Sequence, residues 1–227
     1  MSARAVRSTP PVVPTTVVEP SSLPERLPEQ PYVLFVGPLA PHKGIRQLLA
    51  AYERLASPPP MVLIGTTWPN TPRHFPTGVT VLQGLPHPQV MTAWEGCLFG
   101  VLPSICAEAL GDVVIEAMSA GKAMIGSRAG GIVDLIDDGE TGILVPPGDV
   151  GALAAAMEGL IRDAALRDRM GQRARVRSEA FTIERIVPRF IALYQDVIGS
   201  HPLPATHTGG WESGDASRRK ATQGGSR

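Results

Sequence analysis

Short runs of apolar residues recur along the chain, and most are followed by glycine or proline. The runs cover residues 32–37, 61–65, 79–82, 98–103, 122–126 and 142–145. A short, continuously apolar run is typical of a strand that is buried on both faces, as strands of parallel sheets are. The pattern therefore predicts about six strands of one parallel sheet.

Helical patterns separate several of these runs. Residues 44–56 repeat leucine and tyrosine at helical spacing, and shorter helical patterns cover 88–97 and 112–121. Strands that alternate with helices predict right-handed crossovers and helices on both faces of the sheet. We therefore expect an α/β fold with a doubly wound parallel sheet, in which a ligand lies beyond the carboxyl ends of the strands.

The C-terminal part of the chain has helical patterns without intervening strands. Segments 151–163, 164–180 and 182–199 follow Asp149, a residue type that often caps the start of a helix. We expect these segments to form a helical cover on the domain, with Pro188 kinking or interrupting the last one.

The two ends of the chain differ in composition from the middle. Residues 1–31 contain seven prolines and no helical period, which predicts a linker or arm. Residues 200–227 are small, polar and basic, which predicts a disordered tail. Residues 32–199 are thus expected to form one domain, since 227 residues with 43% hydrophobic content suffice for one core.

Charge and cysteine content exclude several classes of function. Lys plus Arg and Asp plus Glu both total 21, so we expect no nucleic-acid partner and no attraction to anionic lipid. The two cysteines, Cys97 and Cys106, lack metal-ligand spacing and are interpreted as reduced thiols. The N-terminus lacks a signal-peptide pattern and no run could span a bilayer, so we expect a cytoplasmic protein without a transmembrane segment.

Two carboxylates flank a glycine between residues 103 and 131. Glu108 lies in a predicted loop, and Glu116 lies in the helix that follows Gly111. Both could face a ligand over the helix start, where free backbone N–H groups and the helix dipole favour an anion. Phosphate and sugar hydroxyls could then be bound together. The alternatives are that Glu108 faces water or caps the helix, and that Glu116 is exposed on its polar face.

The loop at residues 37–44, GPLAPHKG, is a second candidate for anion binding. Lys43 precedes a predicted helix, so a phosphate could lie on backbone amides with the lysine supplying charge. The loop has neither the P-loop pattern nor the G-x-G-x-x-G dinucleotide pattern. The alternative is a solvated lysine.

Other polar residues are assigned no chemistry. Asp137 and Asp138 lie in a sequence typical of a turn, so we expect no metal site there. His42 and His87 have no evident carboxylate partner and are interpreted as surface histidines, and Trp94 is expected to pack in the core.

Together these segments resemble a known enzyme family. The segments are FVGPLAPHKG, LIG, GLPHPQVMTAWEGC, PSICAEALGDVVIEAMSAGKAMIGSRAGGIVDLI and DGETGILVPPGD, in that order. They resemble the C-terminal donor-binding domain of retaining nucleotide-sugar glycosyltransferases with the GT-B fold, in glycosyltransferase family 4. The resemblance covers roughly residues 32–198 and implies the Rossmann-like half of a GT-B fold.

The resemblance implies roles for individual residues. Glu108 matches the glutamate that contacts the transferred sugar, Glu116 the one that holds the ribose hydroxyls, and Lys43 the diphosphate-binding lysine. Residues 109–112 match the loop whose amides meet the sugar and diphosphate. The implied donor-binding set is Gly37, Lys43, Gly65, Leu85, Glu108, Ala109, Leu110, Gly111, Asp112 and Glu116. The segments at Gly65 and Leu85 correspond to backbone that lines the base. Glu108 and Lys43 are the best catalytic candidates.

The sequence departs from the family pattern in three ways. Pro38 stands where arginine is common, which removes one of two diphosphate charges. Ala109 and Leu110 replace a usual glycine and aromatic residue, which changes the shape of the sugar loop. The family's N-terminal acceptor domain is absent, so residues 1–31 resemble an interdomain linker.

The leading hypothesis is therefore the donor-binding half of a hexosyltransferase-like glycosyltransferase, with a nucleotide-diphosphate sugar as substrate and no cofactor or metal. Its partner would be a separate or missing acceptor domain. The alternative is a non-catalytic nucleotide-sugar-binding module or subunit. A doubly wound oxidoreductase is a third hypothesis, which the absent dinucleotide pattern disfavours.

Overall fold

The six predicted apolar runs all form strands in the computed structural model, which describes residues 27–200. The strands are β1 (Tyr32–Val36), β2 (Met61–Ile64), β3 (Val79–Leu82), β4 (Cys97–Leu102), β5 (Met124–Ser127) and β6 (Gly142–Val145). Most of their residues are buried, as continuously apolar strands require. The predicted fold class is confirmed.

All strand pairs are parallel, and the order in the sheet is β3-β2-β1-β4-β5-β6. The chain therefore moves outward from β1 to β3, returns to the other side of β1, and moves outward again from β4 to β6. Val33 of β1 lies opposite Met61 of β2 on one side and Phe99 of β4 on the other. The loops after β1 and β4 thus meet at the switch point of the sheet, where doubly wound folds bind ligands.

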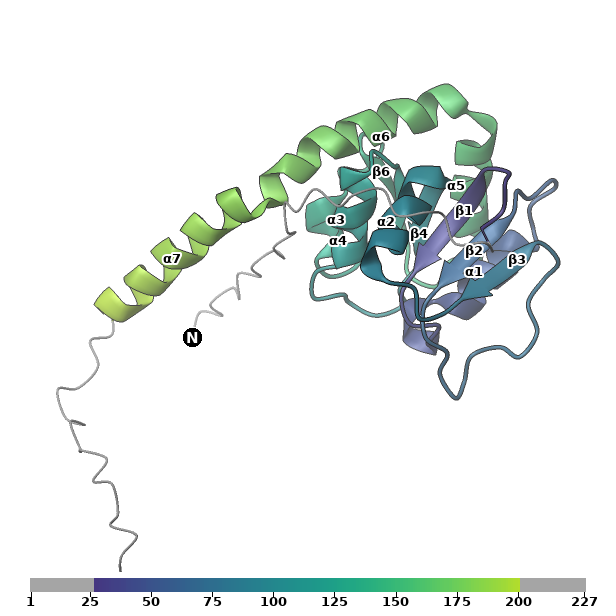
Figure 1. Cartoon of the computed structure of the whole chain (residues 1–227), viewed down its shortest axis with the longest axis horizontal. Helices are drawn as coiled ribbons and strands as arrows, with labels where there is room; N and C mark the ends of the chain where they lie inside the picture. Colours follow the sequence, from purple (N-terminus) through teal and green to yellow (C-terminus); the bar gives the residue numbers. More distant parts are fainter. Residues whose placement is uncertain (1–26, 201–227) are drawn as a thin grey trace, which may run out of the picture. The chain divides into compact units, whose positions relative to one another are not determined.

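Helices cover both faces of this sheet (Figure 1). The helices of the described chain are α1 (Ile45–Tyr52), α2 (His87–Gly96), α3 (Asp112–Ser119), α4 (Ile132–Leu135), α5 (Val150–Arg162), α6 (Ala164–Ser178) and α7 (Ile183–Ser200), with 3-10 turns η1 (Pro41–Lys43) and η2 (Glu179–Phe181). Helix α7 is not among those that cover the sheet. Helix α1 packs against α5, whereas α3 packs against α2, α4 and α6. Helix α4 was not predicted, because four residues are too few to show helical periodicity.

Trp94 of α2 is one of the largest fully buried side chains and helps to place α2 on the sheet. A Cβ atom added to Gly100 of β4 would lie only 2.6 Å from its ring, so this strand needs glycine beneath the indole. Phe35 and Phe99 of the two central strands belong to the same core. The predicted packing of Trp94 is confirmed.

The ends of the described chain bear on three predictions. Leu27 is partly buried against the core, while residues 1–26 of the predicted arm and 201–227 of the predicted tail lie outside the described residues. We expected Pro188 to kink or interrupt the last helix; helix α7 continues through Pro188, so it is not interrupted there. A proline removes one main-chain hydrogen bond, and the turns on either side continue the helix.

Helix α7 exposes an apolar set of side chains. The chain has two compact units, and the boundary between them lies inside this helix, between Phe190 and Ile191. The exposed residues are Val187, Ile191, Leu193, Tyr194, Val197 and Ile198. Contiguous exposed apolar side chains are typical of surfaces that contact another protein or domain. Among residues 27–200, no helix has both the length and the apolar character to cross a membrane.

Candidate functional site

The loops after β1 and β4 touch each other at the switch point. Gly44 has a φ of +73°, and an added Cβ atom would lie 1.9 Å from the carbonyl oxygen of Pro103. The Ile105 N–H donates to the carbonyl of His42 over 2.9 Å. These backbone contacts place Lys43, at the end of η1, beside the loop that carries Glu108.

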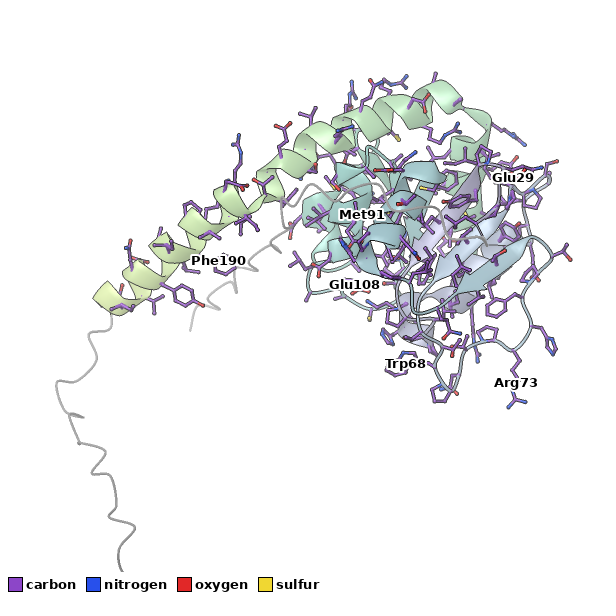
Figure 2. The ribbon with its side chains drawn as sticks, viewed as in Figure 1. Glu29, Trp68, Arg73, Met91, Glu108 and Phe190 are labelled. Carbon is purple, nitrogen blue, oxygen red and sulfur yellow. The ribbon has the colours of Figure 1, made fainter. Side chains whose placement is uncertain are left out.

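Lys43 and Glu108 form a partly buried ion pair. Lys43 Nζ lies 2.7 Å from Oε1 and 2.8 Å from Oε2 of Glu108, and the two side chains are 20% and 12% exposed. The hydroxyl of buried Ser104 donates to Oε1. Figure 2 labels Glu108 in this loop. The structure therefore brings together two residues from separate loops that the resemblance assigns to one donor site. Glu108 does not cap α3, and its side chain is largely shielded from water.

The surroundings of Glu108 keep it ionised. Burial raises the pKa of its carboxyl, but the hydrogen bonds from Lys43 and Ser104 lower the pKa by more, so the net shift is downward. Since an ionised carboxylate only accepts hydrogen bonds, Glu108 is suited to bind hydroxyl groups of a ligand at neutral pH.

The main chain of Glu108 is held by the double glycine after β5. The Gly131 N–H donates to the Glu108 carbonyl over 2.8 Å. Gly130 has a φ of +56°, and an added Cβ atom would lie 2.2 Å from that same carbonyl oxygen. The glycine pair thus lets two loops approach each other closely, a role that the sequence pattern alone did not indicate.

The start of α3 matches its prediction. Gly111 is the N-cap residue in a left-handed conformation with a φ of +82°, and Asp112 begins the helix. Ala109 is exposed, and Leu110 is half-buried. The first N–H groups of an α-helix have no partner within the helix, and the binding of an anion at this end stays a prediction.

Glu116 of α3 has two side-chain partners on α2. The indole N–H of Trp94 donates to Oε2 over 3.2 Å, and His87 Nε2 lies 3.1 Å from Oε1. The side chain of Glu116 is only 17% exposed, so the alternative of a solvated residue is wrong. The expectation that His87 lacks a carboxylate partner is also wrong. The residues are far apart in sequence and meet only because α2 packs against α3.

The loops after β2 and β3 end at the same edge of the sheet. A Cβ atom added to Gly65 would lie 1.8 Å from the carbonyl oxygen of Gly37, so these two loops are in backbone contact. The Gly65 N–H donates to the carbonyl of Leu82, at the end of β3. Leu85 follows in the next loop and is half-buried. The assignment of these residues to donor binding stays a prediction.

Trp68 lies beside the Lys43 loop and was not singled out from the sequence. Its ring contacts His42 edge to face, with centroids 5.7 Å apart, and the side chain is half exposed (Figure 2). The sequence did contain an indication of this residue, because the chain has only three tryptophans and Trp68 lies in a loop after a predicted strand.

A separate hollow lies between the turn at residues 137–141 and the helical segments α6 and η2. Its arginines are largely neutralised, because Arg173 pairs with Glu140 and Arg177 pairs with Asp137. The predicted turn is confirmed by the Thr141 N–H, which donates to the Asp137 carbonyl over 2.9 Å. Within residues 27–200, no three His, Cys, Asp or Glu side chains are grouped as a metal site would require. Both cysteines are free, with Cys97 buried and Cys106 exposed.

Comparison with known proteins identifies the family. The model of the family "Glycosyl transferases group 1" matches residues 24–177, which is more than half of the chain. The chain belongs to this family. The match includes the Lys43 loop, the Glu108 loop and helix α3.

Curated relatives are longer than this group 1 chain. It is 29% identical over 194 residues to a D-inositol 3-phosphate glycosyltransferase from Corynebacterium glutamicum, covering 78% of this chain and 46% of the relative. It is 40% identical over 92 residues to an N-acetyl-alpha-D-glucosaminyl L-malate synthase from Bacillus anthracis, covering 40% and 24%. The chain thus spans less than half the length of these relatives.

Solved glycosyltransferase structures share the fold of this group 1 chain. A sucrose-phosphate synthase from Thermosynechococcus elongatus matches with a TM-score of 0.68 and 30% identity, over 77% of this chain and 47% of the other. Anabaena HepE, solved with UDP-glucose, matches with a TM-score of 0.65 and 23% identity, over 73% and 49%. The predicted Rossmann-like half of a GT-B fold agrees with these matches.

Proposed function

We propose that this chain is the C-terminal, donor-binding half of a family 4 glycosyltransferase, which transfers a sugar from a nucleoside diphosphate with retention of configuration. The observation that carries the proposal is the Lys43–Glu108 pair at the switch point, in a chain of the group 1 family. The pair brings a cation, which would bind the diphosphate, next to a carboxylate, which would bind the sugar. Both lie where a parallel sheet binds ligands.

Lys43 would act on the diphosphate. Its ammonium has three N–H donors, of which two bond to Glu108 and a third is left for a phosphate oxygen. The amides at the start of α3 would bind the same group. As the bond to the sugar breaks, negative charge grows on the departing nucleotide, and a fixed cation there lowers the energy of the transition state.

Glu108 would bind hydroxyls of the transferred sugar, and Glu116 those of the ribose. Their different contacts favour different duties, because Glu108 is paired with the lysine whereas Glu116 accepts from the neutral indole of Trp94. Backbone at Gly37, Gly65 and Leu85 would line the rest of the donor. We propose no metal and no cofactor, so a chelator should leave donor binding unchanged.

The proposed partner is an acceptor domain, supplied by another chain or by a longer form of this protein. Two observations support it: the chain spans less than half of its curated relatives, and α7 exposes an apolar face. Such a domain would also exclude water from the reacting sugar.

Calorimetric titration of the chain with UDP and UDP-glucose tests donor binding. UDP is the first probe because Anabaena HepE, which shares the fold, was solved with UDP and with UDP-glucose. Replacing Lys43 with alanine should weaken binding by about tenfold or more, since a charge-assisted phosphate contact is lost. Arg169→Ala, an exposed cation on α6, is the matched control and should bind as the wild type does. Equal affinity of the Lys43 variant and the wild type would contradict the proposal.

A non-catalytic binding subunit is the second candidate. Pro38, in place of the second cation that the family pattern carries, favours it. Assays of sugar transfer with the chain alone and with a co-expressed acceptor domain separate the two. Transfer by the combination supports the enzyme, whereas donor binding without transfer in either case supports the binding subunit.

A further inference from the structure

The indole ring of Trp94 is fixed in position by the core around it. The side chain is fully buried, and its ring lies against β4, where even a Cβ atom on Gly100 would come within 2.6 Å. A buried indole N–H requires a hydrogen-bond acceptor, because an unpaired polar group in the core costs about 1–3 kcal/mol. The acceptor here is Oε2 of Glu116 at 3.2 Å.

The two oxygens of Glu116 therefore lie in different surroundings. Oε2 is bonded to the buried indole, whereas Oε1 faces His87, whose side chain is 58% exposed. A contact from a fully buried ring restrains the carboxylate, and a contact from an exposed ring is easily exchanged for another donor. A carboxylate has about four acceptor sites, so the indole and the imidazole leave one on each oxygen.

We propose that Trp94 is a positioning residue for nucleotide recognition: it fixes the Glu116 carboxylate so that both oxygens accept from the two hydroxyls of a ribose. The inference rests on the proposed function, in which Glu116 binds ribose, and it assigns the selection of ribonucleotides to a residue in the core. His87 is a replaceable neighbour that the ligand does not require.

The test is the preference for a ribonucleotide over its deoxy analogue. Calorimetry on the full 227-residue chain compares the tightest binder among UDP, ADP and GDP with its 2′-deoxy form. The wild type should prefer the ribonucleotide by about tenfold, as expected for one hydrogen bond to a charged acceptor. Trp94→Phe removes the N–H but keeps an aromatic ring, and should reduce the preference to about threefold or less. Glu116→Gln should reduce it similarly, and His87→Ala should preserve it.

The control for a general loss of stability is Tyr32→Phe. The hydroxyl of Tyr32, on β1, donates to the carbonyl of Ala93, which precedes Trp94 on α2. The variant therefore also loses a buried hydrogen bond to α2, but not one to Glu116. It should keep the wild-type preference. A preference that is lost in Glu116→Gln but retained in Trp94→Phe overturns the role of Trp94 alone. Failure of the wild type to bind any of the three diphosphates would overturn the proposed function instead.

A measurement on the wild type covers the case in which Trp94→Phe does not fold. In ¹⁵N-labelled protein, the Trp94 indole proton should exchange slowly, and its resonance should shift more on binding the ribonucleotide than on binding the deoxy form. Equal shifts with the two ligands would overturn the inference.

Discussion

Glu108 is the most constrained carboxylate of the candidate site. Its side chain accepts from Lys43 and Ser104, and its main-chain carbonyl accepts from Gly131. These contacts come from the loops after β1, β4 and β5, so they all form only when the three loops are correctly placed. The downward shift of its pKa means that the ionised form stabilises the fold.

Replacing Glu108 with glutamine should change the acid stability of the protein. The pKa of Glu108 is lower in the folded protein than its ordinary value of 4.5, so the unfolded chain takes up the proton first as the pH falls. The stabilisation is complete above about pH 4.5 and is lost as the pH falls through the folded pKa. The urea midpoint of Glu108→Gln should therefore decline less than that of the wild type between about pH 5 and about pH 3.

The matched control for this prediction is Glu95→Gln, which removes a glutamate from an exposed position on α2. It should follow the wild-type decline in urea midpoint. If Glu108→Gln and Glu95→Gln decline in parallel, the Lys43 pair does not contribute to stability in the way that we describe.

Pro38→Arg should strengthen diphosphate binding. Pro38 is half-buried in the loop that ends at Gly44, and arginine there would add a second cation to Lys43. We expect about a three- to tenfold gain in UDP affinity by calorimetry, which should shrink as salt screens the charges. Pro38→Ala separates the loss of the proline from the gain of the charge. Equal affinities of the arginine and alanine variants would argue against a diphosphate near this position.

At the scale of elements, the site depends on close backbone contacts between loops. The loops after β1 and β4 touch at Gly44 and Pro103, and those after β1 and β2 touch at Gly65 and Gly37. A side chain at Gly44 would overlap the loop that carries Glu108, and a side chain at Gly65 would overlap the loop after β1. Gly44 is required both by space and by its positive φ, whereas Gly65 is required by space alone.

Gly44→Ala should destabilise the protein by about 3 kcal/mol or more, because the new methyl group would overlap the Pro103 carbonyl and the backbone has a positive φ. Gly139→Ala is the matched control, with a φ of +79° and no atoms within 4 Å of the added Cβ. It should lower the free energy of unfolding by about 1 kcal/mol, because only the positive φ is unfavourable for alanine there. Chemical denaturation measures both. Similar losses in the two variants would show that the loops can move apart.

At the scale of the molecule, helix α7 is the surface on which we expect the proposed acceptor domain to bind. Its exposed face includes Ile191 and Ile198, which are 51% and 62% exposed. Burying such side chains against another domain would stabilise an assembly by about 25 cal/mol per Å² of apolar surface before the costs of association. The face is therefore where we expect an acceptor domain to dock.

The double variant Ile191→Glu with Ile198→Glu should weaken association with a co-expressed acceptor domain, since charges would have to be buried at the interface. UDP affinity of the chain alone should be unchanged. Co-purification measures the first and calorimetry the second. The exposed double variant Arg185→Glu with Arg189→Glu, on the polar positions of the same helix, tests whether any change of charge has the same effect. Undiminished co-purification of the isoleucine variant would place the acceptor domain elsewhere.

The sequence by itself determined the strands, their parallel arrangement and the identity of the candidate residues. Continuous apolar runs are a local signal, and so is the capping residue Asp149, which precedes α5 as expected. The resemblance to glycosyltransferases rested on short segments and on their order along residues 32–198, both of which can be read without the structure. Helix α4 was missed because it is too short to carry such a signal.

Only the tertiary structure decided which side chains meet. Lys43 and Glu108 are 65 positions apart, and Trp94 and Glu116 are 22 apart, so no local pattern records either contact. The first pair forms because β1 and β4 are neighbours in the sheet, and the second because α2 packs on α3. Hydrophobic periodicity specifies which face of an element is buried, whereas the partner on that face is set by the packing of the whole core.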